Sequence, residues 1–576
     1  FVESKKDSNS PSQILFIGKV EDDHGLKKLS FWFSQNNNGP FKQKQIKLGS
    51  NSIQDFYYFT DLDSLGIDQI FYFFSITDND AINGFKTTKT PIYNFRSLDK
   101  AVIDKLKKDK NNALKEQMAS LMSNSNKKLK ELERLKNKLQ QKKSLTWQEQ
   151  KQIKELMKEQ DILINEFNEL KEEQKKRLDS PLFNESLSNE LLEKQKKLQE
   201  LFDELVPDDL KKLMDELEKE LDELSKDKSM EMLEKMSMTN EELNNELDRM
   251  MELFKQFEFE VKMDEVISEI DDLKKKQLKE AAETKDKGND LDKQKEKQDN
   301  LNDAFKDIRK DFDEMERLNN ELENKNKILE TDSLEQVVEE MMKEGSENLE
   351  KGKRNKGSDS QKKAGDKMQE LQEMVQDMKD QIMKDNISVD MAMLEKLLNN
   401  LINISFAQED MIKKSKGINP KGNKYKSYIQ EQFKISEDLE IIEDSLHALS
   451  KRVMQLESFV MKELSSVKKN LKKSINNLTN RQVSKAKVNQ QYSMTSLNNL
   501  ALMLSESLEQ MQSQMAAGMK GCQNCQKKKG NKSGPKSIGD MQKQLGEQLK
   551  KLKDGKGKGM GEKGHKQWNK SLAQMA

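Results

Sequence analysis

Residues 241–261 read EELNNELDRMMELFKQFEFEV, and the spacing of their apolar side chains decides the fold class of this chain. The apolar positions alternate in steps of four and three residues: Leu243, Leu247, Met250, Phe254, Phe257 and Val261. Such steps place side chains along one seam of an α-helix. Similar sequence, rich in Lys, Glu, Asp, Leu and Met, fills residues 208–419, which contain no proline. The pattern therefore predicts long helices, which would span about 320 Å if they were unbroken.

The overall composition excludes several ordinary globular domains. Of the 576 residues, 33% are hydrophobic and 36% are charged, and the mean hydropathy is −0.97. Ordinary domains are nearer ~45–50% apolar and ~25% charged. The apolar side chains suffice for narrow helical seams but not for several thick cores. No apolar run approaches the ~20 residues that a membrane helix needs. Two cysteines exclude a disulfide framework.

Charge is distributed unevenly, although the net charge is −1. Residues 203–272 hold 25 acidic and 9 basic residues, whereas residues 520–570 hold 15 lysines and 4 acidic residues. The tail beyond Gly518 is rich in Gly and Lys, which is typical of disorder. We expect this basic tail to contact an acidic helix or anionic lipid. Nucleic acid is a poorer fit, because Trp568 is the one aromatic residue of the tail and base stacking needs several.

Residues 1–96 have a different character and hold 17 of the 33 aromatic residues. Short apolar runs alternate there with turn-rich pieces, and they predict strands at 12–20, 29–34, 55–60, 69–77 and 90–95. Closely spaced strands with many aromatic residues are typical of a small antiparallel sandwich. We expect a small antiparallel β-sandwich that is truncated at its start.

Helical patterns begin near Leu98 and give a mainly α fold. Thr146 with Glu149, and Thr239 with Glu242, have the spacing of capping boxes, which begin helices. The apolar phase shifts near Asp264, so one uninterrupted coiled coil is not expected. The pattern leaves open whether the long amphipathic helices pair between chains as a coiled coil or fold back within one chain as an extended bundle. The predicted order is a β-sandwich over 1–96, helical hairpins over 97–206, long helices with heptads over 207–344, a flexible linker over 345–366, a helical region over 367–517 and a tail with a short helix over 518–576.

Two motifs of the tail are weak candidates for binding sites. The segment GNKSGPKS at 530–537 nearly matches a phosphate-binding loop, but Pro535 replaces the second glycine and has no amide to donate. Cys522 and Cys525 have the spacing of metal ligands, yet only His565 is nearby and a closed zinc site needs four ligands. We expect neither a nucleotide nor a structural metal there.

The other candidates for chemistry are isolated residues. Asp78, Asp80 and Asn83 have some features of a calcium loop, and the acidic run at 21–23 would supply further carboxylates, but Lys89 stands where a bidentate Glu is needed. A polar β-turn is the alternative interpretation. His24 and His447 stand alone in sequence, and no nucleophile is paired with a base. The sequence therefore predicts no catalytic, cofactor-binding or metal-binding residues and no enzyme.

Several longer phrases resemble one known family over nearly the whole chain and in the same order. The phrases are VEDDHGLKKLSFWF (20–33), ITDNDAINGFKTTKT (76–90), ELDRMMELFKQFEFE (246–260), LLNNLINISFAQEDM (397–411), IIEDSLHALSKRV (441–453) and QQYSMTSLNNLALMLSESLEQMQSQM (490–515). With them the chain resembles the bacterial domain-of-unknown-function family 4175. The resemblance implies N-terminal membrane helices, then an immunoglobulin-like β domain, then a long helical region. It implies a cell-envelope protein without an established activity, and it carries no functional residues.

These observations favour a membrane-anchored scaffold or protein-interaction protein of the bacterial cell envelope. The helical seams would bind protein partners or a second copy, and the soluble part would lie in the periplasm. Because the sequence begins at Phe1 and not at Met, we expect the membrane segment to precede it. The alternative is a cytosolic coiled-coil rod that binds nucleic acid or the chromosome through the basic tail.

Overall fold

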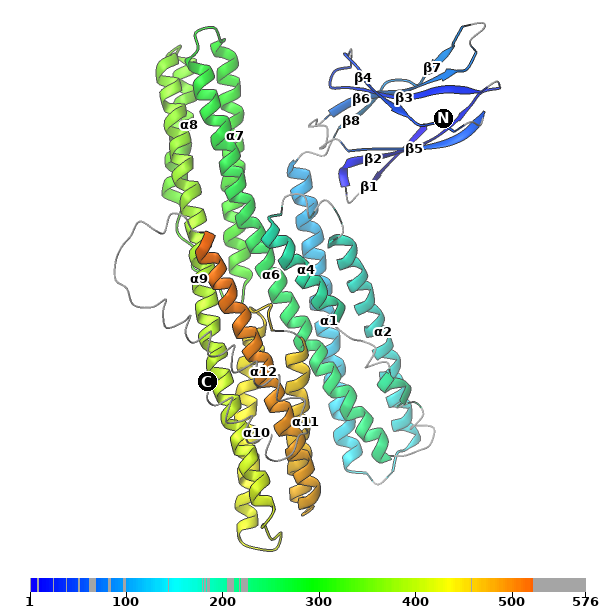
Figure 1. Ribbon diagram of the computed structural model, residues 1–576, viewed down its shortest axis with the longest axis vertical. Helices are drawn as coiled ribbons and strands as arrows, with labels where there is room; N and C mark the ends of the chain where they lie inside the picture. Colours follow the sequence, from blue (N-terminus) through cyan, green and yellow to red (C-terminus); the bar gives the residue numbers. More distant parts are fainter. Residues whose placement is uncertain are drawn as a thin grey trace. The chain divides into compact units, whose positions relative to one another are not determined.

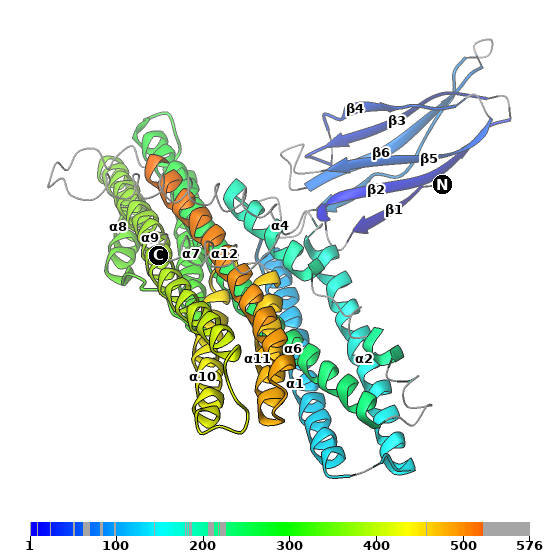
Figure 2. The same ribbon diagram turned by 60° about the horizontal axis from the view of Figure 1, so that its bottom comes forward.

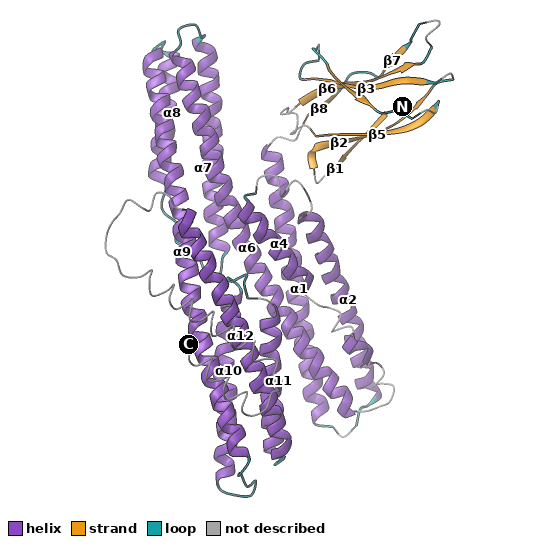
Figure 3. Cartoon of the chain, viewed as in Figure 1, coloured by secondary structure: helices purple, strands orange, loops and turns teal. Residues whose placement is uncertain are grey.

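The computed structural model divides into two compact units, which are described separately. The first comprises Phe1–Ala119 and Asn168–Leu187, and the second comprises Ser120–Phe167 and Ser188–Ala576. The structure describes residues 2–7, 10–23, 25–37, 39–49, 52–61, 69–80, 84–96, 100–142, 144–178, 180, 183, 187–204, 212–216, 218, 226–456 and 458–521. Long helices follow small antiparallel sheets, so the predicted fold class is confirmed (Figure 3).

The first unit is built around a β-sandwich (Figure 1, Figure 2). Its strands are β1 (Val2–Asp7), β2 (Ser10–Glu21), β3 (Leu26–Ser34), β4 (Lys42–Ile46), β5 (Ile53–Asp61), β6 (Gln69–Asp78), β7 (Thr87–Lys89) and β8 (Tyr93–Arg96). One antiparallel sheet has the order β1-β2-β5, and the other has the order β4-β3-β6-β7, with β8 also pairing β6. Pairing of the second strand with the fifth, and of the third with the sixth, is the arrangement of immunoglobulin-like sandwiches.

Aromatic side chains fill the space between the two sheets. Phe31 lies opposite Phe74 in the β3–β6 register, and both contact Phe16 from the other sheet, with ring centroids 5.5 and 5.1 Å away. The sequence located the strands that contribute these residues but missed β1, β4 and β7. β4 reads KQKQI and buries only its last side chain, and all three side chains of β7 are exposed. Neither strand has an apolar alternation from which it could be found.

Two helices extend from the first unit into the second. They are α1 (Lys100–Gln140) and α2 (Trp147–Leu178). Their halves in the first unit are tied by the Arg177 guanidinium, which donates to the Asn111 side chain over 2.6 Å. The predicted capping box at the start of α2 is confirmed, because the Glu149 carboxylate accepts a 2.8 Å bond from the Thr146 amide.

The second unit begins with a three-helix cluster. The halves of α1 and α2 in this unit pack against the first part of α6 (Lys226–Lys285), and α4 (Asn189–Glu204) lies along α6. Leu132, Leu139, Ile153 and Met236 are among the buried residues of this core. The side-chain amides of Gln160 and Asn240 exchange two hydrogen bonds of 2.8 and 3.1 Å inside it.

A four-helix bundle follows. The second part of α6 packs with α7 (Leu291–Glu321), α8 (Asp332–Glu350) and the first part of α9 (Arg354–Ser415). Its core contains Phe259, Phe305, Val338 and Leu371. A layer of buried amides crosses the core, because Gln277 and Gln361 both donate to Gln298, over 2.8 and 2.9 Å. A buried polar layer of this kind favours one alignment of the helices over neighbouring ones.

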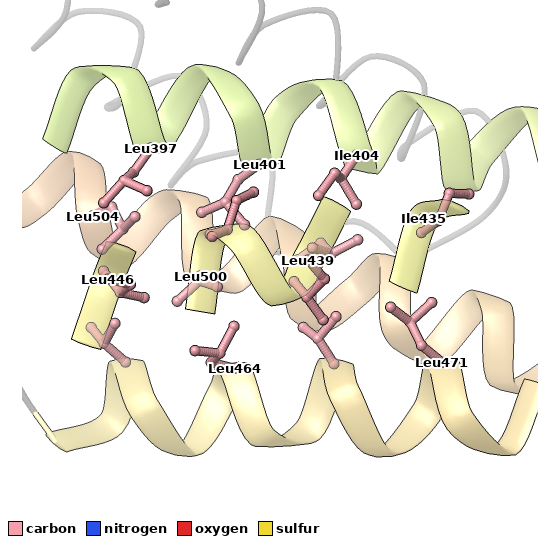
Figure 4. Packing of buried hydrophobic residues seen from close by; sticks show 14 of the residues in the cluster. Leu397, Leu401, Ile404, Ile435, Leu439, Leu446, Leu464, Leu471, Leu500 and Leu504 are labelled. Carbon is pink, nitrogen blue, oxygen red and sulfur yellow. The ribbon is translucent and has the colours of Figure 1, made fainter. Parts of the chain in front are cut away.

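A second four-helix bundle contains the rest of α9 with α10 (Lys424–Ser450), α11 (Ser458–Thr479) and α12 (Val483–Gly521). Figure 4 shows the leucine and isoleucine side chains of all four helices pointing toward one another. The core also holds an amide layer, in which Gln432 donates to Gln408 over 2.9 Å and accepts from Gln490 over 2.7 Å. The helices thus pair within one chain as bundles.

The sequence was wrong about the interior of α6. Thr239 does not begin a helix: it lies inside α6, and its hydroxyl donates to the Lys235 carbonyl over 3.0 Å, as interior Thr residues do. The phase shift near Asp264 lies within α6, which continues to Lys285. As expected, no uninterrupted coiled coil forms: α6 contributes Leu233 and Met236 to the core with α1 and α2 and, from Phe259 onward, side chains to the core shared with α7 and α9.

The predicted flexible linker over 345–366 is also wrong. α8 continues to Glu350 and α9 begins at Arg354, so only a tight turn separates them. The glycines of this segment permit close packing of helices: a Cβ on Gly357 would lie 2.8 Å from Leu349 Cδ2, and one on Gly365 would lie 2.5 Å from Leu278 Cδ2. Composition alone does not distinguish such glycines from those of a linker.

Two further features concern the start of the tail and the apolar character of the helices. α12 continues to Gly521, beyond the predicted start of the tail at 518, and residues 522–576 lie outside the described residues. Within the ranges that are described, no helix combines the length and the apolar character that crossing a membrane requires.

Candidate functional site

Most of the candidates in the tail lie outside the described residues. This holds for Cys522, Cys525, His565, Trp568 and the segment 530–537, and also for His24 and Asn83 near the sandwich. Their arrangement stays a prediction.

The acidic turn residues of the sandwich have local roles. The Asp78 carboxylate accepts hydrogen bonds from the amides of Asp80 and Lys86, over 3.4 and 3.0 Å. The Asp22 carboxylate accepts a 2.9 Å bond from the Gly25 amide. Carboxylates that bond backbone amides in this way stabilise turns, which is the polar-turn interpretation. Among the described side chains, no group of three or more His, Cys, Asp and Glu could hold a metal ion.

An opening of about 420 Å³ lies in the sandwich between the β1 and β7 sides. Core side chains such as Leu29, Phe56 and Phe74 form its apolar part, and Lys19, Glu21 and Lys89 lie at its polar part. Lys19 and Glu21 form an ion pair of 3.8 Å with each other. The opening therefore presents an apolar surface beside this ion pair and a further lysine.

The most elaborate polar arrangement lies at the middle of α6, where the end of α7, the middle of α9 and the connection from α10 to α11 meet it. We call this arrangement the α6 junction; its residues are Glu246, Asp248, Arg249 and Glu252 of α6 with Glu323, Asp390, His447 and 450–456. Two of the phrases that carry the family resemblance, 246–260 and 441–453, meet there.

Arg249 is the centre of the junction and is only 1% exposed. Its Nε donates to the Ser450 carbonyl over 3.0 Å, one Nη donates to the Leu456 carbonyl, and the other donates to Glu246 over 3.2 Å. Ser450 ends α10 and Leu456 precedes α11. The planar guanidinium, with donors in a fixed geometry, thus holds both ends of one turn against α6.

Ion pairs surround Arg249 at the surface of the junction. The Lys451 ammonium lies 2.7 Å from Asp248 and 2.9 Å from Glu323, so it bridges α6 and the end of α7. The His447 side chain lies 3.5 Å from the same Asp248 carboxylate. The hydrogen bond from His447, supported by Lys451, lowers the pKa of Asp248 to about 2 against the cost of partial burial. Burial lowers the pKa of Lys451, but the two carboxylates outweigh it and raise that pKa overall.

The junction also reaches α9 and the end of α7. The Arg452 guanidinium lies 2.6 Å from the Asp390 carboxylate of α9. Burial raises the pKa of Asp390, and Arg452 opposes this shift. The Glu252 carboxylate accepts a hydrogen bond from the Glu323 amide and pairs with Lys255 at 3.1 Å. The buried Asp390 carboxylate and the Glu323 amide are therefore satisfied by groups of other segments of the chain.

This arrangement holds α6 and the segments around it in fixed positions, and it does not suggest a chemical reaction. Each carboxylate is engaged by a cation or an amide, and no nucleophile lies beside a base among the junction residues. In the sequence His447 stood out only as an isolated histidine, and nothing singled out Arg249 or Asp248. Arg249 falls between the seam positions Leu247 and Met250, so periodicity treats it as a surface residue. The one local feature that sets Arg249 apart is that this charged residue stands directly before two methionines.

Comparison with protein-family models, with curated proteins and with solved structures finds no match to this chain.

Proposed function

We propose that the protein is a non-enzymatic scaffold of the bacterial cell envelope that holds protein partners at fixed positions. A segment before Phe1 would anchor it in the membrane, as the resemblance to family 4175 implies, and the described part would lie in the periplasm. The observation that carries the proposal is the sharing of long helices between neighbouring cores. α6 has 60 residues and α9 has 62, and each contributes to two successive cores.

Helices that pass through two cores join them without a hinge. A helix of this length spans about 90 Å at ~1.5 Å per residue. The α6 junction supports the scaffold role further, because Arg249 and Lys451 fasten the α10–α11 turn to the middle of α6. A rigid framework of this kind suits the spacing of partners.

The sandwich supplies a surface that suits a protein partner. Leu15, Ile53, Tyr57 and Phe59 are between 36% and 67% exposed, and they belong to the neighbouring strands β2 and β5. Leu15 lies opposite Phe59 in the register of these strands. Clustered apolar side chains on the outer face of a sheet mark interaction sites more often than inert surface.

Photo-crosslinking in the source cells tests the proposal. A photoreactive phenylalanine analogue replaces Tyr57 in the full-length protein, and the same analogue replaces the exposed Lys44 of β4 as the control. We expect a protein adduct at position 57 but not at 44, in the membrane fraction. Adducts at neither position, or a soluble protein that co-purifies with chromosomal DNA, would favour the cytosolic rod instead.

A further inference from the structure

One end of the α9–α12 bundle carries a dense group of basic side chains. The turn at 416–423 joins α9 to α10, and the turn at 480–482 joins α11 to α12 (Figure 1). The Tyr425 hydroxyl donates to the Leu478 carbonyl over 2.6 Å, so the two turns lie side by side. We call the surface formed by residues 411–430 and 468–488 the basic tip.

The basic tip contains no acidic residue, although the net charge of the whole protein is only −1. Residues 411–430 include six lysines, and residues 468–488 include six lysines and one arginine, and neither range contains Asp or Glu. The acid-free stretch extends from 464 to 505. A surface of one sign attracts a partner of the opposite sign, because its field is not cancelled locally.

Acidic neighbours outside the tip neutralise only part of it. Lys413 and Lys414 pair with Glu409 and Glu431 at 3.0 and 2.6 Å. Lys468 and Lys472 pair with acidic residues of α6 and α10. Six further basic side chains form no ion pair with any described residue: Lys421, Lys424, Lys426, Arg481, Lys485 and Lys487.

The positions of these charges act against the stability of the helices. Lys424 and Lys426 lie in the first turn of α10, and Lys485 lies in the first turn of α12. Neither first turn contains an acidic residue. A cation at a helix N-terminus is unfavourable because the amide groups there already carry partial positive charge. Folding therefore does not explain the lysines, whereas an anionic partner would be bound by the lysines and the helix ends together.

The surroundings of the tip favour a lipid surface over nucleic acid. Tyr425 and Tyr428 are buried, and their hydroxyls bond to carbonyls inside the bundle, so they offer no face for base stacking. On α12, Val488 and Tyr492 are 46% and 60% exposed, and they are one helical turn apart next to Lys485 and Lys487. Lysines beside exposed apolar and aromatic side chains suit a bilayer interface, where headgroups are anionic and acyl chains are near.

We propose that the basic tip binds the surface of a membrane that contains anionic phospholipid. The lysines would lie at the level of the phosphate groups, with Val488 and Tyr492 at the boundary of the acyl chains. The contact differs from the anchor before Phe1 and from the basic tail. It is independent of the scaffold proposal, since vesicle binding can fail while the partner contact at Tyr57 holds, and the reverse is equally possible.

The test uses the full chain and vesicles of phosphatidylglycerol mixed with phosphatidylcholine, with pure phosphatidylcholine vesicles for comparison. The tip variant changes six of the basic residues that form no ion pair to glutamine: Lys421→Gln, Lys424→Gln, Lys426→Gln, Arg481→Gln, Lys485→Gln and Lys487→Gln. The matched control changes six exposed lysines elsewhere on the second unit: Lys343→Gln, Lys351→Gln, Lys353→Gln, Lys356→Gln, Lys362→Gln and Lys363→Gln. Both variants lose the same charge and keep the whole tail.

Co-sedimentation should show wild-type binding to the anionic vesicles, weaker at high salt, because salt screens surface charges over ~8–10 Å. The tip variant should bind at least about tenfold more weakly, since each lysine near an anionic surface contributes appreciably. The control should change by less than about threefold. Circular dichroism monitors folding, and Lys424→Glu with Lys485→Glu serves as a second variant. It places acids where helix N-termini favour them and should also abolish most of the binding.

Three results would overturn the proposal. The first is the absence of wild-type binding to anionic vesicles. The second is an equal loss of binding in the tip variant and in the control, which would mean that the net charge of the protein, and not the basic tip, determines vesicle binding. The third is a folded tip variant that keeps its vesicle binding but no longer binds duplex DNA or single-stranded RNA, which would assign the tip to nucleic acid.

Discussion

At the scale of single residues, Gly365 sets how closely α9 approaches α6. A Cβ at this position would lie 2.5 Å from Leu278 Cδ2 and 2.8 Å from its Cγ. Contacts of that length require the Leu278 side chain, which is 37% exposed, or one of the helices to move. Overpacking of this kind costs ~1–3 kcal/mol. We expect Gly365→Ala to lower the free energy of unfolding by that amount. Gly417→Ala is the control, because nothing lies within 4 Å of its Cβ and its φ is not positive.

Chemical denaturation followed by circular dichroism measures both variants. A change within about 0.5 kcal/mol is expected for the control, as for other uncrowded surface positions. If Gly365→Ala were as stable as Gly417→Ala, the close approach of the helices would not be what the glycine provides.

Among the residues of the α6 junction, we expect substitution of Arg249 to lower the free energy of unfolding most. Arg249→Met removes three donors and leaves the carbonyls of Ser450 and Leu456 and the Glu246 carboxylate without their partner. Breaking a buried charged pair typically costs ~3–5 kcal/mol. We expect a loss of that size in denaturant unfolding. The exposed Arg134→Met serves as the control and should change stability by less than ~1 kcal/mol.

Arg249→Lys separates the charge from the shape of the side chain. Lysine keeps the charge but lacks a planar fork that reaches two carbonyls. It should therefore recover only part of the loss. Full recovery would mean that the guanidinium geometry does not matter at the junction.

At the scale of elements, the sequence predicted what depends on local periodicity. It located the strands that form the sandwich core, because their apolar residues alternate, and it located the start of α2 from Thr146 and Glu149. It placed a false start at Thr239 because the capping-box pattern also occurs inside helices. The glycines at 345–365 predicted a linker, but they are there to make room for Leu278 and Leu349. Leu278 is distant in sequence and Leu349 lies on another helix, so the local sequence does not reveal this role.

The junction could not be predicted for the same reason. Arg249 bonds to residues about two hundred positions away, with sequence separations of 201 and 207. No local pattern encodes such a contact. The sequence did indicate that the phrases 246–260 and 441–453 both carry the family resemblance, and these phrases meet in the fold.

The seam of α6 gives a prediction at the scale of this element. Phe254 lies on the predicted seam and is fully buried. Phe254→Ala should lower the free energy of unfolding by ~3–5 kcal/mol, because it leaves a cavity in a packed core. Lys275→Gln removes a charge whose side chain is 65% exposed and should leave the free energy of unfolding nearly unchanged. The reverse order of effects would show that surface charges stabilise α6 more than its seam does.

At the scale of the second unit, apolar contacts hold each bundle together, and polar contacts add to the shared helices in joining the bundles. The core of α9–α12 is rich in leucine, whereas the core of α6–α9 mixes leucine, methionine, phenylalanine, isoleucine and valine. Between α6 and the α10–α11 region the contacts are the guanidinium of Arg249 and ion pairs such as Lys451 with Asp248 and Lys472 with Glu234. Acid should therefore loosen the connection between bundles before it disrupts their cores.

Asp248 makes this pH dependence testable. The hydrogen bond from His447 and the nearby Lys451 lower the pKa of Asp248 from 3.8 to about 2. Because the pKa of the folded state lies below that of the unfolded state, Asp248 contributes stability above about pH 4 that is lost as the pH falls toward 2.

Asp248→Asn lacks this contribution at every pH. Denaturant unfolding from pH 6 to pH 2 should show wild type more stable than the variant at pH 6, with the difference closing below pH 4. His447→Gln removes the main cause of the shift and should reduce the part of the difference that depends on pH. A constant difference down to pH 2 would mean that the Asp248 carboxylate is not what connects α6 to the α10–α11 turn.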